Sequence, residues 1–192
     1  MKISFIRHCN TVANSKNQFS GFLETPYSEL GEEQFIALCK KLPALSCQKV
    51  YTSPLSRCTR IAQEICRIHR VPVITDKRLR EVDFGGFDGH NREECQALFP
   101  EVFAAWQADR TKVTYPNGES YSLLRKRLIP FLEEVITQNE DIAITTHRGV
   151  IQTACAHLLQ LPLASMWNFA FDNGSITEIQ VVQGNCLLTT IQ

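Results

Sequence analysis

The sequence of 192 residues predicts a three-layer α/β/α domain with a largely parallel central sheet. Two observations lead to this fold class. Short apolar strand patterns alternate with longer segments of helical periodicity, as in sheets whose parallel strands are joined by helices. Apolar residues make up 44% of the chain, which is enough for one hydrophobic core at this length. The sequence contains no internal repeat or linker, so residues 1–192 are interpreted as a single domain.

In the first half of the chain, apolar runs and helix caps define the expected elements. Ser28 is a typical N-cap for a helix that ends before Pro43. Ser53 and Pro54 have the residue types of an N-cap and a first helical position, and an apolar stripe then continues to Ile68. Strands are expected over residues 2–6, 49–52 and 71–75, and a polar loop over residues 7–27.

The second half begins with a glycine-rich segment, residues 81–89, which predicts irregular backbone. Pro130 is expected to kink or break the helix that contains it. Gly184–Asn185 is the expected turn of a C-terminal hairpin. The remaining segments are expected as helices over residues 91–98, 120–137 and 150–159, a long loop over 99–118, and strands over 141–146, 175–182 and 186–191.

The charge balance and the cysteines limit the classes of function. Lys plus Arg and Asp plus Glu are equal at 20 each, which argues against nucleic acid or an anionic membrane as the main partner. The first apolar segment is interrupted at Arg7–His8 before it reaches the length of an export signal, and no apolar run is long enough to span a membrane. Eight scattered cysteines without a Cys-x-x-Cys pair favour reduced thiols in a cytoplasmic protein over disulfides or a zinc site.

Polar residues follow three of the predicted strands, at the sheet edge where ligands bind in α/β proteins. Arg7–His8 follows the first strand, residues 53–57 follow the second, and His147–Arg148 follows the strand that ends at Thr146. A guanidinium can hold two phosphate oxygens, and a neutral imidazole can attack phosphorus. Each residue alone has an ordinary structural explanation, but their convergence on one edge predicts a phosphoryl-transfer site.

Arg57 and Glu81 complete the set of groups that this chemistry needs. Arg57 lies in the first turn after Ser53–Pro54 and can reach the same edge, and Glu81 can protonate a leaving alkoxide. The sequence has no clustered carboxylates or His-x-x-x-His pair for a metal, no Gly-x-x-x-x-Gly-Lys loop, and no Cys with an Arg six positions later. We therefore expect His8 to be the nucleophile of a phosphatase that uses no metal or other cofactor.

Short motifs along nearly the whole chain follow an order typical of one enzyme family. Residues 7–14 read Arg-His-Cys-Asn-Thr-Val-Ala-Asn, and residues 53–57 read Ser-Pro-Leu-Ser-Arg. Further matching segments are residues 20–26, 28–34, 79–89, 116–120 and 147–151. In these motifs the sequence resembles the histidine phosphatase superfamily, which includes the phosphoglycerate mutases. The resemblance implies a phosphoglycerate mutase-like fold and a phosphomonoester hydrolase.

This resemblance also implies roles for individual residues. His8 corresponds to the nucleophile that becomes phosphorylated, and Glu81 corresponds to the proton donor. His147 corresponds to the second catalytic histidine. The phosphate pocket corresponds to Arg7, Arg57, Asn14 and His147, and the loop residues implied to bind substrate are Ser20 and Gly21.

Within the family, the sequence is most similar to the α-ribazole phosphatases of cobalamin biosynthesis, in length and in the segments around Trp106 and Met166–Trp167. This similarity implies α-ribazole 5′-phosphate, a small-molecule phosphate ester, as the substrate. Phe22, Phe87 and Trp106 are expected in loops at the rim of the pocket, whereas Trp167 is expected to pack in the core. A broad-specificity small-molecule phosphatase and a phosphoprotein phosphatase are the alternatives, and a homodimer is left open.

Cys9 and Arg148 are among the residues that depart from the family pattern. Cys9 replaces a glycine beside the nucleophile and is expected to narrow the pocket. Arg148 replaces a glycine after the second histidine and adds a cation of the kind that a carboxylate-bearing substrate needs. A third interpretation is a phosphate-binding regulator in which the change at Cys9 weakened catalysis. The retained Glu81 argues against it, because binding alone needs no proton donor.

Overall fold

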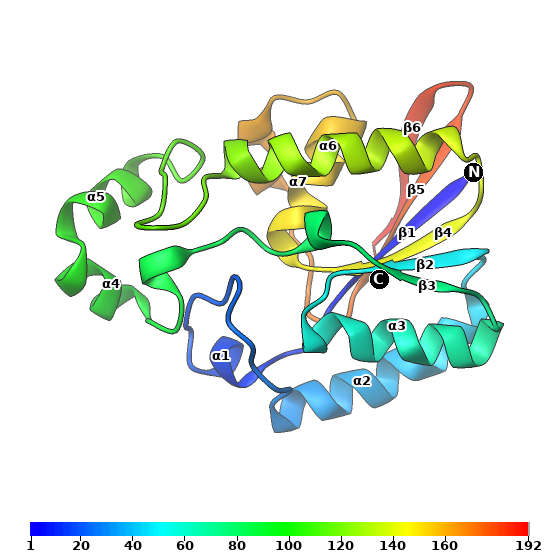
Figure 1. Cartoon of the computed structure of the whole chain (residues 1–192), viewed down its shortest axis with the longest axis horizontal. Helices are drawn as coiled ribbons and strands as arrows, with labels where there is room; N and C mark the ends of the chain where they lie inside the picture. The colour runs from blue at the N-terminus through cyan, green and yellow to red at the C-terminus, as the bar shows by residue number, and fades with distance from the viewer. Residues whose placement is uncertain (192) are drawn as a thin grey trace.

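The computed structural model describes residues 1–191, which form a six-stranded, mostly parallel sheet with the strand order β3-β2-β4-β1-β5-β6 (Figure 1). The first four strands in this order are parallel, and β5 and β6 add an antiparallel edge. The strands are β1 (Lys2–Arg7), β2 (Lys49–Thr52), β3 (Val73–Thr75), β4 (Ile142–Thr146), β5 (Ile176–Val182) and β6 (Asn185–Ile191). The predicted α/β fold with a largely parallel sheet is confirmed.

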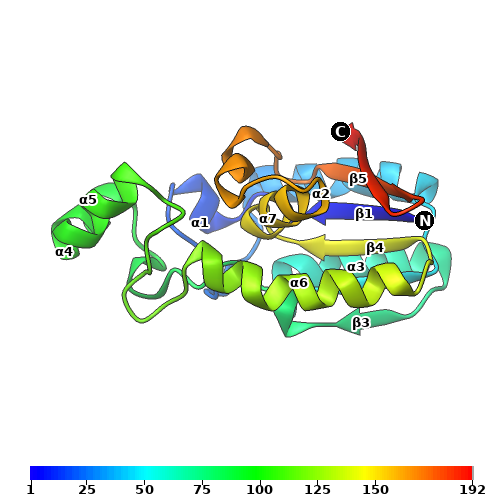
Figure 2. The same cartoon turned by 90° about the horizontal axis from the view of Figure 1, so that it is seen from above.

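Helices cover both faces of the sheet, with α2 and α3 on one face and α6 and α7 on the other (Figure 1, Figure 2). The short helices α4 and α5 project beyond one end of the sheet. The α-helices are α1 (Val12–Ser15), α2 (Glu29–Lys41), α3 (Ser56–His69), α4 (Arg92–Leu98), α5 (Pro100–Ala108), α6 (Tyr121–Thr137) and α7 (Arg148–Leu158). The 3-10 helices are η1 (Leu42–Ala44), η2 (Lys77–Leu79), η3 (Gly85–Phe87) and η4 (Leu163–Asn168).

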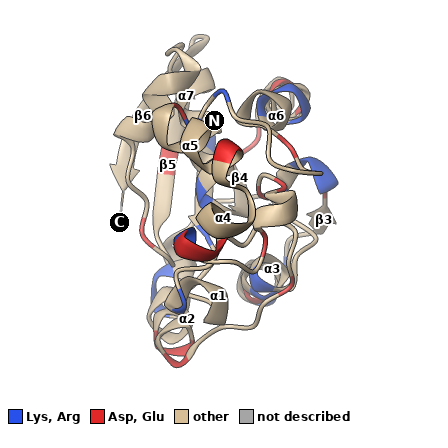
Figure 3. Cartoon of the chain, turned by 90° about the vertical axis from the view of Figure 1, so that its left-hand side faces the viewer, with Lys and Arg blue, Asp and Glu red and all other residues tan. Residues whose placement is uncertain are grey.

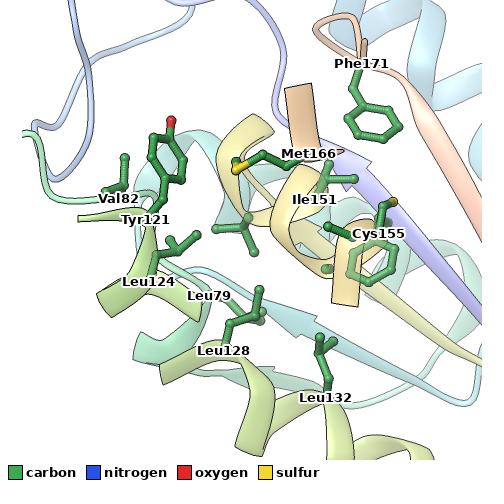
Figure 4. Packing of buried hydrophobic residues seen from close by; sticks show 14 of the residues in the cluster. Leu79, Val82, Tyr121, Leu124, Leu128, Leu132, Ile151, Cys155, Met166 and Phe171 are labelled. Atoms are coloured by element: carbon green, nitrogen blue, oxygen red, sulfur yellow. The ribbon is translucent and has the colours of Figure 1, made fainter. Parts of the chain in front are cut away.

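The alternation of side chains along the strands produces two hydrophobic clusters. In β1, Ile3 and Phe5 belong to the cluster under α6 and α7, whereas Ile6 belongs to the cluster under α2 and α3. Figure 4 shows part of the first cluster, with side chains from α6, α7 and η4: Leu124, Leu128, Leu132, Ile151, Cys155 and Met166. Because both faces of the parallel strands are covered, ligands reach the sheet at the ends of its strands.

The loop predicted over residues 99–118 is wrong, because this segment contains helix α5. Pro100 occupies the first turn, where its missing N–H costs no intrahelical bond. Phe103 and Trp106 lie one turn apart and are 3% and 6% exposed, and their rings stack with centroids 5.2 Å apart. The helical spacing of Phe103 and Trp106 was therefore present in the sequence. The turn-forming residues that follow them led to the prediction of a loop for the whole segment.

Three smaller predictions also need correction. Helix α3 begins at Ser56, so Ser53 is not its N-cap. Helix α6 runs through Pro130, so of the expected kink or break the break is wrong. The hairpin turns at Gln183 and Gly184, which have φ values of 50° and 79°, because a two-residue turn of this hand needs positive φ at both positions.

Charged residues of both signs are interspersed over the end of the molecule that carries α1, α4 and α5 (Figure 3). This pattern agrees with the equal numbers of basic and acidic residues in the sequence. Within residues 1–191, no helix combines the length and the apolar character needed to cross a membrane.

Candidate active site

The two histidines of the predicted site lie side by side because they follow neighbouring parallel strands. β1 pairs with β4 in a register that places Arg7 opposite Thr146, so the next residues, His8 and His147, leave the sheet together. Their ring centroids are 5.2 Å apart with an interplanar angle of 63°. His8 is 5% exposed and His147 is fully buried. The parallel register therefore brings together two residues that are 139 positions apart in the sequence.

The hydrogen bond of His8 fixes the tautomer of its ring. Nδ1 lies 2.8 Å from the carbonyl oxygen of Cys9. A carbonyl only accepts, so Nδ1 carries the proton and Nε2 keeps its lone pair. Burial, followed by the charges of Arg57 and Arg7, holds the pKa of His8 well below its ordinary 6.5. The ring is therefore neutral at physiological pH and has a free nucleophilic nitrogen.

His147 is also held as one neutral tautomer. Its Nδ1 accepts a hydrogen bond of 3.3 Å from Arg57 Nε, which can only donate. The proton of His147 therefore resides on Nε2, which lies 2.8 Å from Ser53 Oγ. Burial and then the charge of Arg57 lower the pKa of His147 well below 6.5. Ser53 thus orients the second histidine instead of capping a helix.

Arg57 connects this histidine to the loop that follows α1. Its side chain is 2% exposed, and Nη1 and Nη2 each donate a 2.7 Å hydrogen bond, to the carbonyl oxygens of Leu23 and Gly21. The amide of Gly21 in turn donates to a carboxylate oxygen of Asp88. The guanidinium therefore lies beside His147 and holds the loop in place.

Arg7, unlike Arg57, lines the cavity in front of His8. Its Nη1 donates to the carbonyl oxygen of Phe171 at 2.6 Å, whereas its Nε is buried and has no hydrogen-bond partner among residues 1–191. Burial, followed by the charge of Arg148, lowers the pKa of Arg7 to about 10. Arg7 remains positively charged at neutral pH and keeps an unused donor.

Glu81 reaches the site from the segment after η2 and is held by main-chain amides. Its two carboxyl oxygens accept from Gly149 N at 3.0 Å and from Val82 N at 2.9 Å. A Cβ at position 149 would lie 2.4 Å from Glu81 Oε1, so glycine is required for this close approach. Glu81 is 8% exposed, and burial raises its pKa above the ordinary 4.5. These are the properties of a carboxyl group that retains a proton for donation.

The remaining predicted residues, Asn14, Ser20 and Gly21, differ in their positions. Asn14 accepts from the main chain at Thr11, in the capping box of α1, and from Asn173, which also binds the carbonyl oxygen of His8. Ser20 Oγ is buried and unpartnered among residues 1–191. Both line the cavity, whereas Gly21 contributes only its main chain to the loop behind it.

A cavity of about 220 Å³ collects the groups that face a ligand. Of the predicted site residues, five line this cavity: His8, Arg7, Glu81, Asn14 and Ser20. The other three, Arg57, His147 and Gly21, lie behind this lining. Its other lining residues are Gln18, Phe19, Phe84, Trp106, Arg110, Tyr115, Tyr121, Arg148, Gly149, Gln152 and Trp167. A second cavity of about 740 Å³ adjoins it, with Arg7, Asn14, Trp106 and Arg148 among the residues that line both.

We call His8, Arg57, Glu81 and His147 the buried group, and Arg110, Arg148 and Trp167 the rim, because the latter three are exposed residues of the cavity lining. The rim differs from the prediction. Trp167 is 36% exposed and lines the cavity, so its expected place in the core is wrong. Trp106 lines the cavity as predicted, although from helix α5 and not from a loop.

Three expectations for neighbouring residues are wrong. Phe87 is fully buried in the first hydrophobic cluster. Phe22 lies under the guanidinium of Arg80, outside the cavity lining. Cys9 does not narrow the cavity, because its side chain is fully buried in the second hydrophobic cluster. Only its carbonyl oxygen takes part in the site, through the bond to His8.

The fold and the site together define a class of protein. A mostly parallel α/β sheet carries a neutral histidine with a free ring nitrogen, cationic guanidiniums and a buried carboxyl group at the ends of its strands. These groups are suited to phosphoryl transfer. Among residues 1–191, His, Cys, Asp and Glu side chains form no group of three or more that could hold a metal ion.

Comparison with known proteins identifies the family. The sequence model of the histidine phosphatase superfamily (branch 1) matches residues 3–192, so the chain belongs to this superfamily and is a phosphatase of the histidine type. The resemblance seen in the motifs is thereby confirmed, as is the phosphoglycerate mutase-like fold.

Individual relatives act on different substrates. The chain is 30% identical to phosphoserine phosphatase 1 of Hydrogenobacter thermophilus, over 94% of the chain and 87% of the relative. It is 27% identical to the adenosylcobalamin/alpha-ribazole phosphatase of Salmonella typhimurium, over 100% of the chain and 96% of the relative. The crystal structure of the alpha-ribazole phosphatase from Shigella flexneri superposes with a TM-score of 0.93 at 28% identity, covering 100% of this chain and 96% of that one.

Proposed function

We propose that the protein hydrolyses small phosphomonoesters through a covalent phosphohistidine on His8. The observation that carries this proposal is the 2.8 Å contact between His8 Nδ1 and the carbonyl oxygen of Cys9. It leaves Nε2 with an unprotonated lone pair, on a ring that lines the cavity. The lowered pKa of His8 keeps this lone pair available at physiological pH.

Two unused donors support a phosphate position in front of His8. Arg7 Nε and Ser20 Oγ are buried and have no partner among residues 1–191, and both residues line the cavity. Buried donors without a partner are costly, and a phosphoryl oxygen would satisfy them with charge-assisted hydrogen bonds. We expect the amide side chain of Asn14 to contact the same phosphoryl group.

The chemistry then follows in two displacements. His8 Nε2 attacks phosphorus, the bond from phosphorus to the ester oxygen breaks, and the leaving alkoxide takes the proton of Glu81. In the second step a water molecule attacks phosphorus while Glu81, now ionised, accepts its proton. The phosphorus–nitrogen bond breaks, its electron pair returns to Nε2, and inorganic phosphate leaves.

Arg57 and His147 are proposed to act on the phosphoryl group from behind His8. Arg57 is 2% exposed, so its charge is poorly screened and stabilises the negative charge that develops during transfer. The Nε2–H of His147 donates to Ser53 Oγ and, when substrate binds, donates its hydrogen bond to a phosphoryl oxygen instead, without losing the proton.

α-Ribazole 5′-phosphate is the first candidate substrate. Its support is the likeness of the whole chain to alpha-ribazole phosphatases, with a TM-score of 0.93 at 28% identity for one solved structure. With α-ribazole 5′-phosphate as its substrate, the protein would act in the assembly of the nucleotide loop of cobalamin. The alternatives of a broad-specificity phosphatase and a phosphoprotein phosphatase share the same chemistry and differ only in the leaving group.

Phosphoserine is the second candidate, and a local observation favours it. Arg110 and Arg148 line the cavity as exposed cations, and a carboxylate on the leaving group would pair with them. The relative at 30% identity is named a phosphoserine phosphatase. A regulator without catalysis is disfavoured, because Glu81 is held with the burial and raised pKa of a proton donor.

Trapping of the covalent intermediate tests the proposed function. Purified protein is mixed with a labelled aryl phosphate in excess chelator, quenched in base, digested and mapped. We expect label on His8 that is stable in base and labile in acid, and turnover that persists in the chelator. Label on another residue, or activity that returns only with a divalent cation, would contradict the proposal.

A further inference from the structure

The cavity and its neighbour hold more positive charge than one phosphoryl group needs. The chain has a formal net charge of +0, yet the linings of the two cavities contain five cations, Arg7, Lys16, Arg92, Arg110 and Arg148, and two acids, Glu81 and Glu93. None of the five cations forms an ion pair within residues 1–191. Arg7 and the nearby Arg57 suffice for the phosphoryl dianion of the proposed function. The other cations therefore need a separate explanation.

Arg148 stands in an electrostatically unfavourable position. It is the first residue of α7, where the positive end of the helix dipole favours an acid over a base. It also lies near enough to Arg7 for its charge to contribute to the lowered pKa of that residue. An anion bound between these groups would relieve both repulsions at once.

Arg110 is held at the same cavity by aromatic rings and not by a carboxylate. Its guanidinium carbon lies 4.6 Å from the ring centroid of Trp106 and 5.6 Å from that of Trp167. A guanidinium held over ring faces keeps the N–H donors of its edge available to a ligand. The two indoles thus position a cation without neutralising it.

From these observations we infer that Arg148 and Arg110 bind a second negatively charged group of the ester, on the leaving-group side of the phosphoryl pocket. The inference rests on the proposed function and specifies its substrate class: small phosphomonoesters whose leaving group carries a carboxylate or a further phosphate.

This subsite separates the two candidate substrates. The leaving group of α-ribazole 5′-phosphate is a neutral nucleoside and offers no anion to the arginines. Its flat base would want a free aromatic face, but Trp106 is 6% exposed and stacks on Phe103. The more exposed ring of Trp167 already contacts Tyr121 and the guanidinium of Arg110. The local chemistry therefore favours the carboxylated ester.

Matched esters that differ in one anionic group provide the test. O-phosphoserine is compared with O-phosphoethanolamine, which lacks only the carboxylate, and fructose 1,6-bisphosphate is compared with fructose 6-phosphate. For at least one pair, we expect kcat/KM to be about tenfold or more higher for the ester with the second anion, as for a hydrogen-bonded charge pair. The pair that shows the preference identifies the anion as a carboxylate or a phosphate.

Three variants assign that preference to residues. Arg148→Gln and Arg110→Gln should each lower the kcat/KM ratio within the preferred pair by about tenfold, and Arg148→Lys should recover part of it. Arg125→Gln on the exposed surface of α6, outside both cavity linings, is the matched control and should leave the ratio as in the wild type.

The outcomes distinguish failure of this inference from failure of the proposed function. If the wild type hydrolyses an aryl phosphate and forms phosphohistidine but shows no preference in either pair, the second anion site is refuted and the phosphatase mechanism stands. Equal losses on both members of the preferred pair in Arg148→Gln and Arg110→Gln would also overturn it, as would a tenfold preference for α-ribazole 5′-phosphate over phosphoserine. If no ester is hydrolysed, the proposed function itself fails.

Discussion

The buried group and the rim belong to the same cavity, one in and behind its inner wall and the other at its exposed edge, but they are built on different principles. The four residues of the buried group are at most 8% exposed, and each is fixed by hydrogen bonds to the main chain or to a neighbouring side chain. The three rim residues are exposed, and Arg110 and Trp167 are held mainly by ring contacts. From this contrast we expect the chemistry to depend on a rigid, dehydrated centre. We expect the choice of ester to depend on exposed side chains, which can be substituted at little cost in stability.

The comparison predicts that the largest loss comes from the centre. His8→Ala removes the nucleophile, so kcat should fall by about three or more orders of magnitude while the protein stays folded. Steady-state hydrolysis of an aryl phosphate measures the loss, and thermal unfolding monitored by circular dichroism checks the fold. Turnover within tenfold of the wild type would show that the two-displacement mechanism is wrong.

The same contrast explains what the sequence could reveal. The residues of the buried group lie in short motifs at or near the ends of predicted strands, and parallel strands present those ends at one edge, so the prediction of their convergence needed no side-chain detail. What could not be predicted is the direction of Arg57, because its partners are carbonyl oxygens of a loop, at Leu23 and Gly21. Main-chain acceptors leave no signature in the residue types.

The rim was mostly beyond sequence reasoning. Arg110, Arg148 and Trp167 come from three separate segments and follow no shared motif. Arg110 follows helix α5, which was predicted as part of a loop, so its place over Trp106 and Trp167 could not be foreseen. Only Arg148 gave a signal, as an extra cation beside the second histidine. Aromatic residues such as Trp167 suit a core and a rim equally well, and the pattern of the sequence does not distinguish the two.

The second-largest effect should come from Glu81 and should depend on the leaving group. In Glu81→Gln, kcat on an alkyl phosphate should fall by about 10²- to 10⁴-fold, because the alkoxide leaves without a proton. An activated aryl phosphate needs little help and should lose far less. Parallel kcat measurements on the two esters provide the ratio.

The glutamine variant also needs a structural control. Both carboxyl oxygens of Glu81 accept from main-chain amides, and the new NH₂ group would oppose one of them. Competitive inhibition by inorganic phosphate shows whether the pocket still binds. Equal kcat losses on alkyl and aryl esters, with phosphate binding retained, would move the proton donor to another residue.

A smaller effect on activity is expected from pH. Its sign follows from the lowered pKa of His8 and the raised pKa of Glu81. The active form has neutral His8 and protonated Glu81. The pKa of His8 is lowered, so the ring stays neutral as the pH falls below 6.5, and the pKa of Glu81 is raised, so the acid persists above 4.5. The profile of kcat/KM, which reports the free enzyme, should therefore have its acid limb below 6.5 and its alkaline limb above 4.5.

Variants separate the two limbs. Glu81→Gln should abolish the alkaline limb on an alkyl phosphate, because the group that titrates there is gone. Arg148→Gln, a rim change, should leave the position of the acid limb nearly the same, since burial and the charges of Arg57 and Arg7 are what lower the pKa of His8. An acid limb at or above 6.5 would mean that His8 is not held neutral by the buried group.

The smallest effect should come from Trp167, and it tests the rim directly. Trp167 is 36% exposed and packs edge-on against Tyr121 with ring centroids 5.1 Å apart. The guanidinium of Arg110 lies over its ring. It touches none of the groups proposed to transfer protons or phosphate, so its contacts to the leaving group should be alike in the ground state and the transition state. Trp167→Ala should then raise KM by about two- to fivefold with little change in kcat. Trp167→Phe, which keeps an aromatic face for Arg110, should recover most of the loss. A tenfold fall in kcat in Trp167→Ala, with the fold intact, would show that the rim also sets the geometry of the buried group and that the two regions are not independent.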